Sequence, residues 1–320
     1  MKTSQSRSVE LATDVTALSH GYTGSKRFLD IASILVFFVL EAAVVFRALP
    51  YVAVHPWTTL FWLVIGYIAA DFMSGLVHWI GDTWGDPSMP VVGQYFIRPF
   101  REHHVDQTAI TRHDFVQTNG ANCLATVVVL LPTVLLAWSS QATWVNAFFV
   151  FIFAMTVGVF GTNQFHKWSH LSSERRPWII RWLQSGKLIL DPVHHSKHHA
   201  APYNTYYCIT VGWLNPILAK MKFFQGVEWL VTKVTGALPR KNDIVLTASK
   251  AVQAVTTLEN KLETKIGGVI GEVKDGVTEV IGEMREGVTG VVHEVKDGVS
   301  GVIQEVSDSL PGSHQSLRHE

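Results

Sequence analysis

The chain has few charged residues and few cysteines for its length. Charged side chains make up 16% of the 320 residues, against about 25% in soluble domains, while apolar residues reach 48%. This deficit of charge is typical of a membrane protein. Basic and acidic residues balance at 26 each, so the net charge does not indicate a nucleic-acid partner. Two cysteines are too few for a disulfide framework or a cysteine-based zinc site.

The ends of the chain also lack the composition of a membrane domain. The first 25 residues contain no continuous apolar core, so we do not expect a cleavable signal peptide there. We expect residues 1–25 to be a flexible N-terminus, residues 26–240 to form the membrane domain, and residues 241–320 to form a separate tail.

Four apolar runs are candidate membrane spans, because a helix of about 20 residues crosses the hydrocarbon core. They are Phe28–Leu49, Trp57–Ile80, Asn122–Trp138 and Trp144–Gly161, and a short turn is expected at Pro50–Pro56 between the first two. The third run is short and contains Pro132, so the count of four depends on a helix that tolerates this proline. The predicted fold is an all-α integral membrane protein with four transmembrane helices, a cytoplasmic histidine-rich cap and a C-terminal amphipathic repeat tail.

Histidine is concentrated in one part of the chain: ten of the fifteen histidines lie between residues 78 and 199. Four spans place all of these histidines on one face of the membrane, together with most of the basic residues near the spans. By the positive-inside rule, that face is expected to be cytoplasmic.

The spacing of the histidines is typical of metal ligands. His166 and His170 are four residues apart, and so are His78 and Asp82, so each pair shares a helix face. His195, His198 and His199 form an HxxHH sequence, and on a helical turn their three imidazoles would converge on one ion. The adjacent His103 and His104 could serve two ions or one. The predicted ligands are one carboxylate and eight imidazoles: His78, Asp82, His103, His104, His166, His170, His195, His198 and His199. Since one zinc site uses three or four ligands, nine are about right for two metals.

Three further polar residues are candidates for supporting roles. His194 could replace His195 as a ligand or orient one, and His113 could also support a ligand from outside. Asp71 lies two turns from His78 and could accept a hydrogen bond from a ligand, although a polar contact inside the helix is an equal alternative.

Several motifs resemble one family of membrane enzymes. The motifs are SGLVHWIGDTWG (74–85), RPFREHHVDQTAITRHDFVQTNGANC (98–123), NQFHKWSH (163–170), HHSKHH (194–199) and YYCITVGWLN (206–215). They are similar to the plasmanylethanolamine desaturase family, which includes bacterial light-response carotenogenesis proteins and, more distantly, plant plastid trans-3 acyl-lipid desaturases. The resemblance covers roughly residues 26–230.

This resemblance implies an O2-dependent oxidoreductase with two iron ions, which converts an alkyl ether phospholipid to a vinyl ether lipid, a plasmalogen. The chain has no flavin or nicotinamide fingerprint, so we expect electrons from a separate donor, a cytochrome b5 or a ferredoxin. Candidate partners of the lipid phosphate are Arg98, Arg101, Arg112 and Lys167, with plain anchoring at the interface as the alternative. Both termini are expected to be cytoplasmic, in a bacterial inner membrane or the endoplasmic reticulum.

Three alternatives remain open from the sequence. A membrane hydroxylase or acyl-lipid desaturase would use the same diiron chemistry, and a zinc-dependent membrane receptor would use similar ligands without catalysis. A transporter is disfavoured, because the histidines gather on one face.

Residues 174–240 are expected to form either interfacial helices or a soluble core.

The tail repeats an apolar pattern every eleven residues. The four units are 267–277, 278–288, 289–299 and 300–310, each apolar at positions three, four, seven and eleven. An eleven-residue period keeps the apolar stripe nearly straight along a helix. A helix on a lipid surface, a right-handed coiled coil, and a tail that becomes helical only against a surface are the alternatives.

Overall fold

The computed structural model describes residues 22–140, 142–200, 203–240, 257 and 274–309. Four long helices form the membrane domain: α2 (Gly24–Val54), α3 (Pro56–Thr83), α5 (Phe115–Ala137) and α6 (Thr143–Ser169). All four are long and apolar enough to cross a membrane, which confirms the four predicted spans. No strand occurs among the residues described, so the fold is all-α as predicted.

Two prolines lie inside these helices without ending them. Pro132 lies within α5, so the third span exists despite its short apolar run. The turn expected from Pro50 to Pro56 is wrong, because α2 continues through Pro50 to Val54 and only His55 separates it from α3. Pro56 opens α3, a position where a missing N–H costs nothing because the first N–H groups of a helix have no intrahelical acceptor.

Helix α6 is the centre of the bundle and packs against α2, α3 and α5. Small residues allow α3 and α6 to approach closely: a Cβ atom at Gly66 would collide with the carbonyl of Phe151, and one at Gly158 with the methyl group of Ala70. In the same bundle, the hydroxyl of Thr156 donates a hydrogen bond to the buried carboxylate of Glu41.

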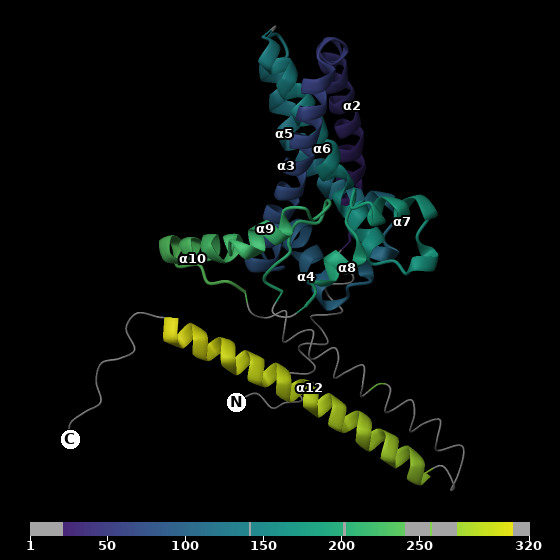
Figure 1. Cartoon of the computed structure of the whole chain (residues 1–320), viewed down its shortest axis with the longest axis vertical. Coiled ribbons are helices and arrows are strands. Elements are labelled where there is room, and N and C mark those ends of the chain that lie inside the picture. Colours follow the sequence, from purple (N-terminus) through teal and green to yellow (C-terminus); the bar gives the residue numbers. More distant parts are fainter. Residues whose placement is uncertain (1–21, 141, 201–202, 241–256, 258–273, 310–320) are drawn as a thin grey trace, which may run out of the picture. The chain divides into compact units, whose positions relative to one another are not determined.

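Shorter helices gather at one end of the bundle (Figure 1). They are η1 (Gly93–Ile97), α4 (Arg98–Val105), η2 (Ala109–Arg112), η3 (Ser173–Arg175), α7 (Trp178–Ser185), α8 (Pro192–Ser196), α9 (Asn215–Lys220) and α10 (Phe223–Thr235). Trp178 and Trp182 on α7 and Trp229 on α10 are exposed. Exposed tryptophans on amphipathic helices favour the interfacial alternative over a soluble core.

The tail forms a second unit of the chain, which divides between Thr247 and Ala248. Its described part is residue 257 and one helix, α12 (Lys274–Ser309), which contains the last four residues of the first repeat, all of the second and third, and all but the last residue of the fourth. Val291, Val292, Val295 and Val299 of the third repeat occupy the predicted apolar positions and are exposed. Residues 1–21 and most of 241–273 lie outside the described residues, so the expectations for the flexible N-terminus and the first repeat remain predictions.

Candidate metal centre

Two of the long helices carry ligand candidates on the ends that extend beyond their apolar runs. His78 and Asp82 lie near the C-terminal end of α3, and His166 lies in the last turn of α6, with His170 directly after it. These ends meet the short helices α4, which carries His103 and His104, and α8, which carries His195 and is followed directly by the turn with His198 and His199. Ligand candidates from four separate parts of the sequence therefore come together at one end of the bundle.

Five imidazoles form a closed ring, which we call the five-histidine group. Its members are His103, His166, His170, His195 and His199. Going around the ring, the Nε2 atoms of neighbouring imidazoles lie 3.0, 3.1, 2.9, 2.8 and 3.0 Å apart. All five Nε2 atoms therefore point toward one small volume.

The other four candidates form a second cluster, which we call the Asp82 group. One carboxylate oxygen of Asp82 lies 3.2 Å from Nε2 of His78, 3.3 Å from Nε2 of His104 and 3.4 Å from Nε2 of His198. All four residues are buried. The two groups are adjacent, since the ring centroids of His198 and His199 are 5.2 Å apart.

The donor chemistry of both groups fits metal ions. A neutral imidazole has one N–H donor and one acceptor nitrogen, so a ring of five Nε2 atoms cannot alternate donors and acceptors all the way round. Burial, followed by the neighbouring imidazoles, lowers the pKa of His103 and His195 well below its usual value, so both rings are neutral. Neutral imidazoles with converging acceptor atoms match nitrogen-ligated iron, copper or zinc, and the carboxylate suits iron.

The chain itself fixes the orientation of two imidazoles in the Asp82 group. His78 Nδ1 lies 3.1 Å from the carbonyl oxygen of Tyr207, and His198 Nδ1 lies 3.0 Å from that of Thr205. A carbonyl can only accept, so each Nδ1 carries the proton and each Nε2 presents its lone pair to the group.

The segment that supplies these two carbonyls, residues 203–215, is held by Asp71 and Asn215. Asp71 Oδ1 accepts hydrogen bonds from the backbone N–H groups of Val211 at 2.9 Å and Gly212 at 2.8 Å, and Oδ2 accepts one from Leu214 at 3.2 Å. Asn215 bonds both backbone groups of Cys208. Asp71 therefore contacts neither group directly and acts through this segment. Sequence reasoning missed Asn215, although it ends the YYCITVGWLN motif.

The structure divides two histidine motifs between the two groups, one of them against expectation. His195, His198 and His199 do not converge on one ion, because α8 ends at Ser196 and the following turn sends His198 to the Asp82 group. His103 and His104 separate between the two groups, which was one of the two alternatives left open.

The remaining candidates lie outside both groups. His194 Nε2 is 3.0 Å from the Asn215 amide nitrogen, so His195 is the one that joins the ligand candidates. His113 is partly buried, and burial together with Arg98, Lys167 and Arg112 lowers its pKa to about 4. Of the four cations predicted for the head group, only Arg98 lines the cavity described next. Arg112 pairs with Asp106 at 2.6 Å, and Lys167 donates to the backbone carbonyl of His113.

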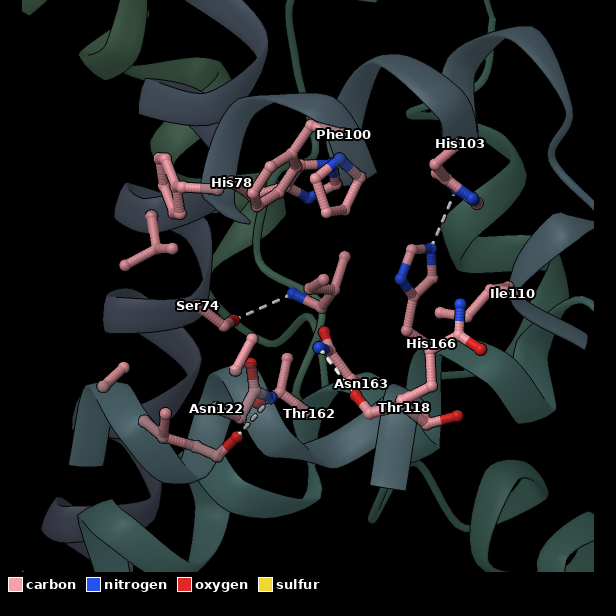
Figure 2. Close-up of a pocket in the computed structure, with 18 of the residues that line it drawn as sticks. Ser74, His78, Phe100, His103, Ile110, Thr118, Asn122, Thr162, Asn163 and His166 are labelled. Carbon is pink, nitrogen blue, oxygen red and sulfur yellow. Dashed lines mark hydrogen bonds between the residues drawn. The ribbon is translucent and has the colours of Figure 1, made fainter. Parts of the chain in front are cut away.

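A cavity of about 240 Å³ leads from these groups into the bundle. His78, His103 and His166 line one end, and Asn122 and Thr162 lie further along it (Figure 2). Most of its lining is apolar, and its polar side chains are largely turned to the backbone: Asn122 donates to the carbonyl of Val159, and Thr162 to that of Gly158. The cavity is therefore suited to a hydrocarbon chain that contacts both groups at one end.

An all-α membrane bundle with two adjacent groups of residues that could hold metal ions, at the end of an apolar cavity, is typical of the integral membrane desaturases and hydroxylases. The family described as the lipid desaturase domain matches residues 67–242. The plasmanylethanolamine desaturase of Myxococcus xanthus is 48% identical over 254 residues, which cover 79% of this chain and 88% of the relative. The chain belongs to the plasmanylethanolamine desaturase family of lipid desaturases, and it is an enzyme of the oxidoreductase class.

Other relatives agree with this assignment. Plasmanylethanolamine desaturase 1 of Mus musculus is 42% identical over 227 residues, covering 70% of this chain and 83% of the relative. The chloroplastic fatty acid desaturase 4 of Arabidopsis thaliana is 35% identical over 176 residues, covering 55% of this chain and 52% of the relative. No solved structure matches the chain significantly.

Proposed function

We propose that the chain is an O2-dependent diiron lipid desaturase that forms the vinyl ether bond of plasmalogens. Its substrate is a 1-O-alkyl ethanolamine phospholipid, and the bond forms between carbons 1 and 2 of the alkyl chain. The observation that carries this proposal is the position of the ligand groups at the polar end of the cavity. A lipid with its head group at that end places its first carbons, rather than the middle of its chain, beside His78, His103 and His166.

The reaction removes one hydrogen atom from each of the two carbons. O2 accepts these two hydrogens together with two electrons from a donor and two protons from solvent, and two water molecules form. Two bound irons would supply the oxidising power that acid–base side chains lack. We assign one iron to the five-histidine group and one to the Asp82 group, which supply all nine predicted ligands.

The protein's own residues bind the lipid and protect the reaction. The apolar walls of α3, α5 and α6 exclude water from the alkyl chain, while the imidazoles at the end of the cavity face its first carbons. Arg98, which pairs with Glu102 at 2.8 Å, and Lys26, which pairs with Asp30, line the same end. We propose that these two cations contact the phosphate of the head group. Of the four cations that the sequence predicts for this role, only Arg98 is kept, and Lys26 is added.

The electron donor is proposed to be an acidic cytochrome b5 or ferredoxin. Lys197 is exposed between His195 and His198 in the sequence, and Arg175 and Arg181 are exposed on and beside α7. Exposed cations on the segments around the ligand groups favour an acidic partner. The same basic residues support a cytoplasmic orientation of this end, in a bacterial inner membrane or the endoplasmic reticulum.

The test is expression in cells that make alkyl ether lipids but no plasmalogens, followed by lipid mass spectrometry. We expect acid-labile vinyl ether lipids with the wild-type chain and none with His170→Ala or His198→Ala, which remove one ligand from each group. His293→Ala is the matched control, since His293 is exposed on α12. Full activity in either ligand variant would contradict the assignment.

Metal analysis and product analysis separate the remaining alternatives. About two irons per chain are expected, whereas one zinc without iron would support a non-catalytic receptor. Acyl-desaturated or hydroxylated lipids in place of vinyl ethers would show that the chain has another activity of the same diiron chemistry.

A further inference from the structure

The cavity lies in a gap between two membrane helices. Helix α6 packs against both α3 and α5, but among the residues described α3 and α5 make no extended contact with each other. The cavity is lined by α3 through Met73 and Val77, by α5 through Ala125 and other residues, and by α6 as its floor. Met73 and Ala125, on the two sides of this gap, line the cavity and are exposed rather than buried. The cavity is therefore a groove that opens sideways, where the bilayer lies.

One face of α5 forms a graded wall along this groove. Ala121, Ala125 and Val129 are spaced four residues apart, so they lie one above another on the same face, and all three line the cavity. Each step along this face is about 6 Å, roughly the length of five methylenes of an extended chain. The small side chains of Ala121 and Ala125 leave room that a larger side chain would fill.

The groove also has a measurable length beyond the ligand groups. On α6 its lining runs over eleven residue steps from His166 to Met155, and on α5 over twelve residue steps from Gln117 to Val129. Eleven residues of helix rise about 16 Å, which corresponds to roughly twelve methylenes. With two reacting carbons beside the ligand groups, the groove accommodates an alkyl chain of roughly fourteen carbons, and any further carbons lie past Val129 in the hydrocarbon of the membrane.

We propose that the groove between α3 and α5 admits the lipid sideways from the bilayer and measures its alkyl chain, with Ala125 and Val129 as the residues that set the length recognised. This inference rests on the proposed desaturase function and adds the specificity of that site. Each methylene within the groove exchanges disordered lipid for fixed van der Waals contacts, while methylenes beyond Val129 contact lipid whether or not the enzyme binds them. Conversion should therefore rise with chain length up to roughly fourteen carbons and then level off.

The experiment uses the full chain in the same plasmalogen-deficient cells. Cells are fed 1-O-alkylglycerols with chains of eight to twenty carbons, and the ratio of vinyl ether to alkyl ether lipid is measured for each length. We call the chain length at which this ratio levels off the levelling point. Ala125→Phe should move the levelling point toward shorter chains by roughly five carbons, since the phenyl ring fills the groove about one helical turn before Val129. Val128→Phe is the matched control on the same helix, because Val128 is 69% exposed and does not line the cavity.

The outcomes separate the two proposals. No vinyl ether of any length from the wild-type chain would contradict the desaturase function itself. Vinyl ethers with a levelling point that Ala125→Phe leaves unchanged, or that Val128→Phe moves equally, would overturn the groove inference alone. If Ala125→Phe does not accumulate in the membrane, Ala125→Leu and Val129→Phe decide, and each should move the levelling point by a smaller amount in the same direction.

Discussion

Asp71 offers a sharp test of how the ligand groups are held in place. Its carboxylate contacts no ligand candidate but accepts three backbone hydrogen bonds from residues 211, 212 and 214. The segment so fixed presents the carbonyls of Tyr207 and Thr205 to His78 and His198. We therefore expect substitutions at Asp71 to weaken iron binding at a distance, by releasing two imidazoles of the Asp82 group.

The size of the effect follows from the bonds lost. Asp71→Asn keeps one oxygen for Val211 and Gly212 but turns an NH2 group toward the N–H of Leu214, which removes one charged hydrogen bond, worth about 1.5–3 kcal/mol. Asp71→Ala leaves three backbone N–H groups without an acceptor, at about 1–3 kcal/mol each. Loss of the groups that orient metal-bound histidines typically lowers metal affinity about 10–100-fold.

The assay is the rate of iron loss from purified protein in lipid nanodiscs after addition of a chelator. We expect one of the two irons to leave at least about tenfold faster from Asp71→Asn than from the wild-type chain. Asp297→Asn is the control for the same chemical change at an exposed site on α12. If Asp71→Asn, properly inserted in the membrane, lost both irons at the wild-type rate, the segment would not position the imidazoles as we reason.

Two further predictions concern the ligand groups themselves. Asp82→Asn should lower the iron content from about two to about one per chain by elemental analysis, because the carboxylate is the only anion of its group and the five-histidine group remains intact; equal loss of both irons would argue against two separate sites. The metal-free protein should unfold at lower temperature as the pH falls from about 6.5 toward 4. Burial lowers the pKa of His170 from 6.5 to about 4, so the unfolded chain binds protons in that range before the folded chain does. A melting temperature that stays constant over that range, measured by nanodisc calorimetry, would contradict this linkage.

The order of the residues along the chain was sufficient to predict the spans and the residue types at the site. Four apolar runs predicted four crossing helices, because a run of about 20 apolar residues has few other stable states. Spacings of four residues predicted that His166 lies beside His170 and that His78 lies beside Asp82, since both pairs lie within or at the end of a continuous helix. The prediction of a turn from Pro50 to Pro56 was wrong, because neighbouring helices can satisfy the backbone group that a proline leaves without a hydrogen bond.

Only the tertiary structure decided how the ligand candidates are divided. Helical periodicity fixes the angle between side chains on one helix, but it says nothing about which helix ends meet. His103 and His104 turn to different groups because α4 lies between the ends of α3 and α6, and His198 leaves its neighbours because α8 ends before it. The role of Asp71 depends on a backbone segment about 140 residues away, and the groove depends on the gap between α3 and α5. Each of these features arises from contacts between distant segments, which no local pattern in the sequence records.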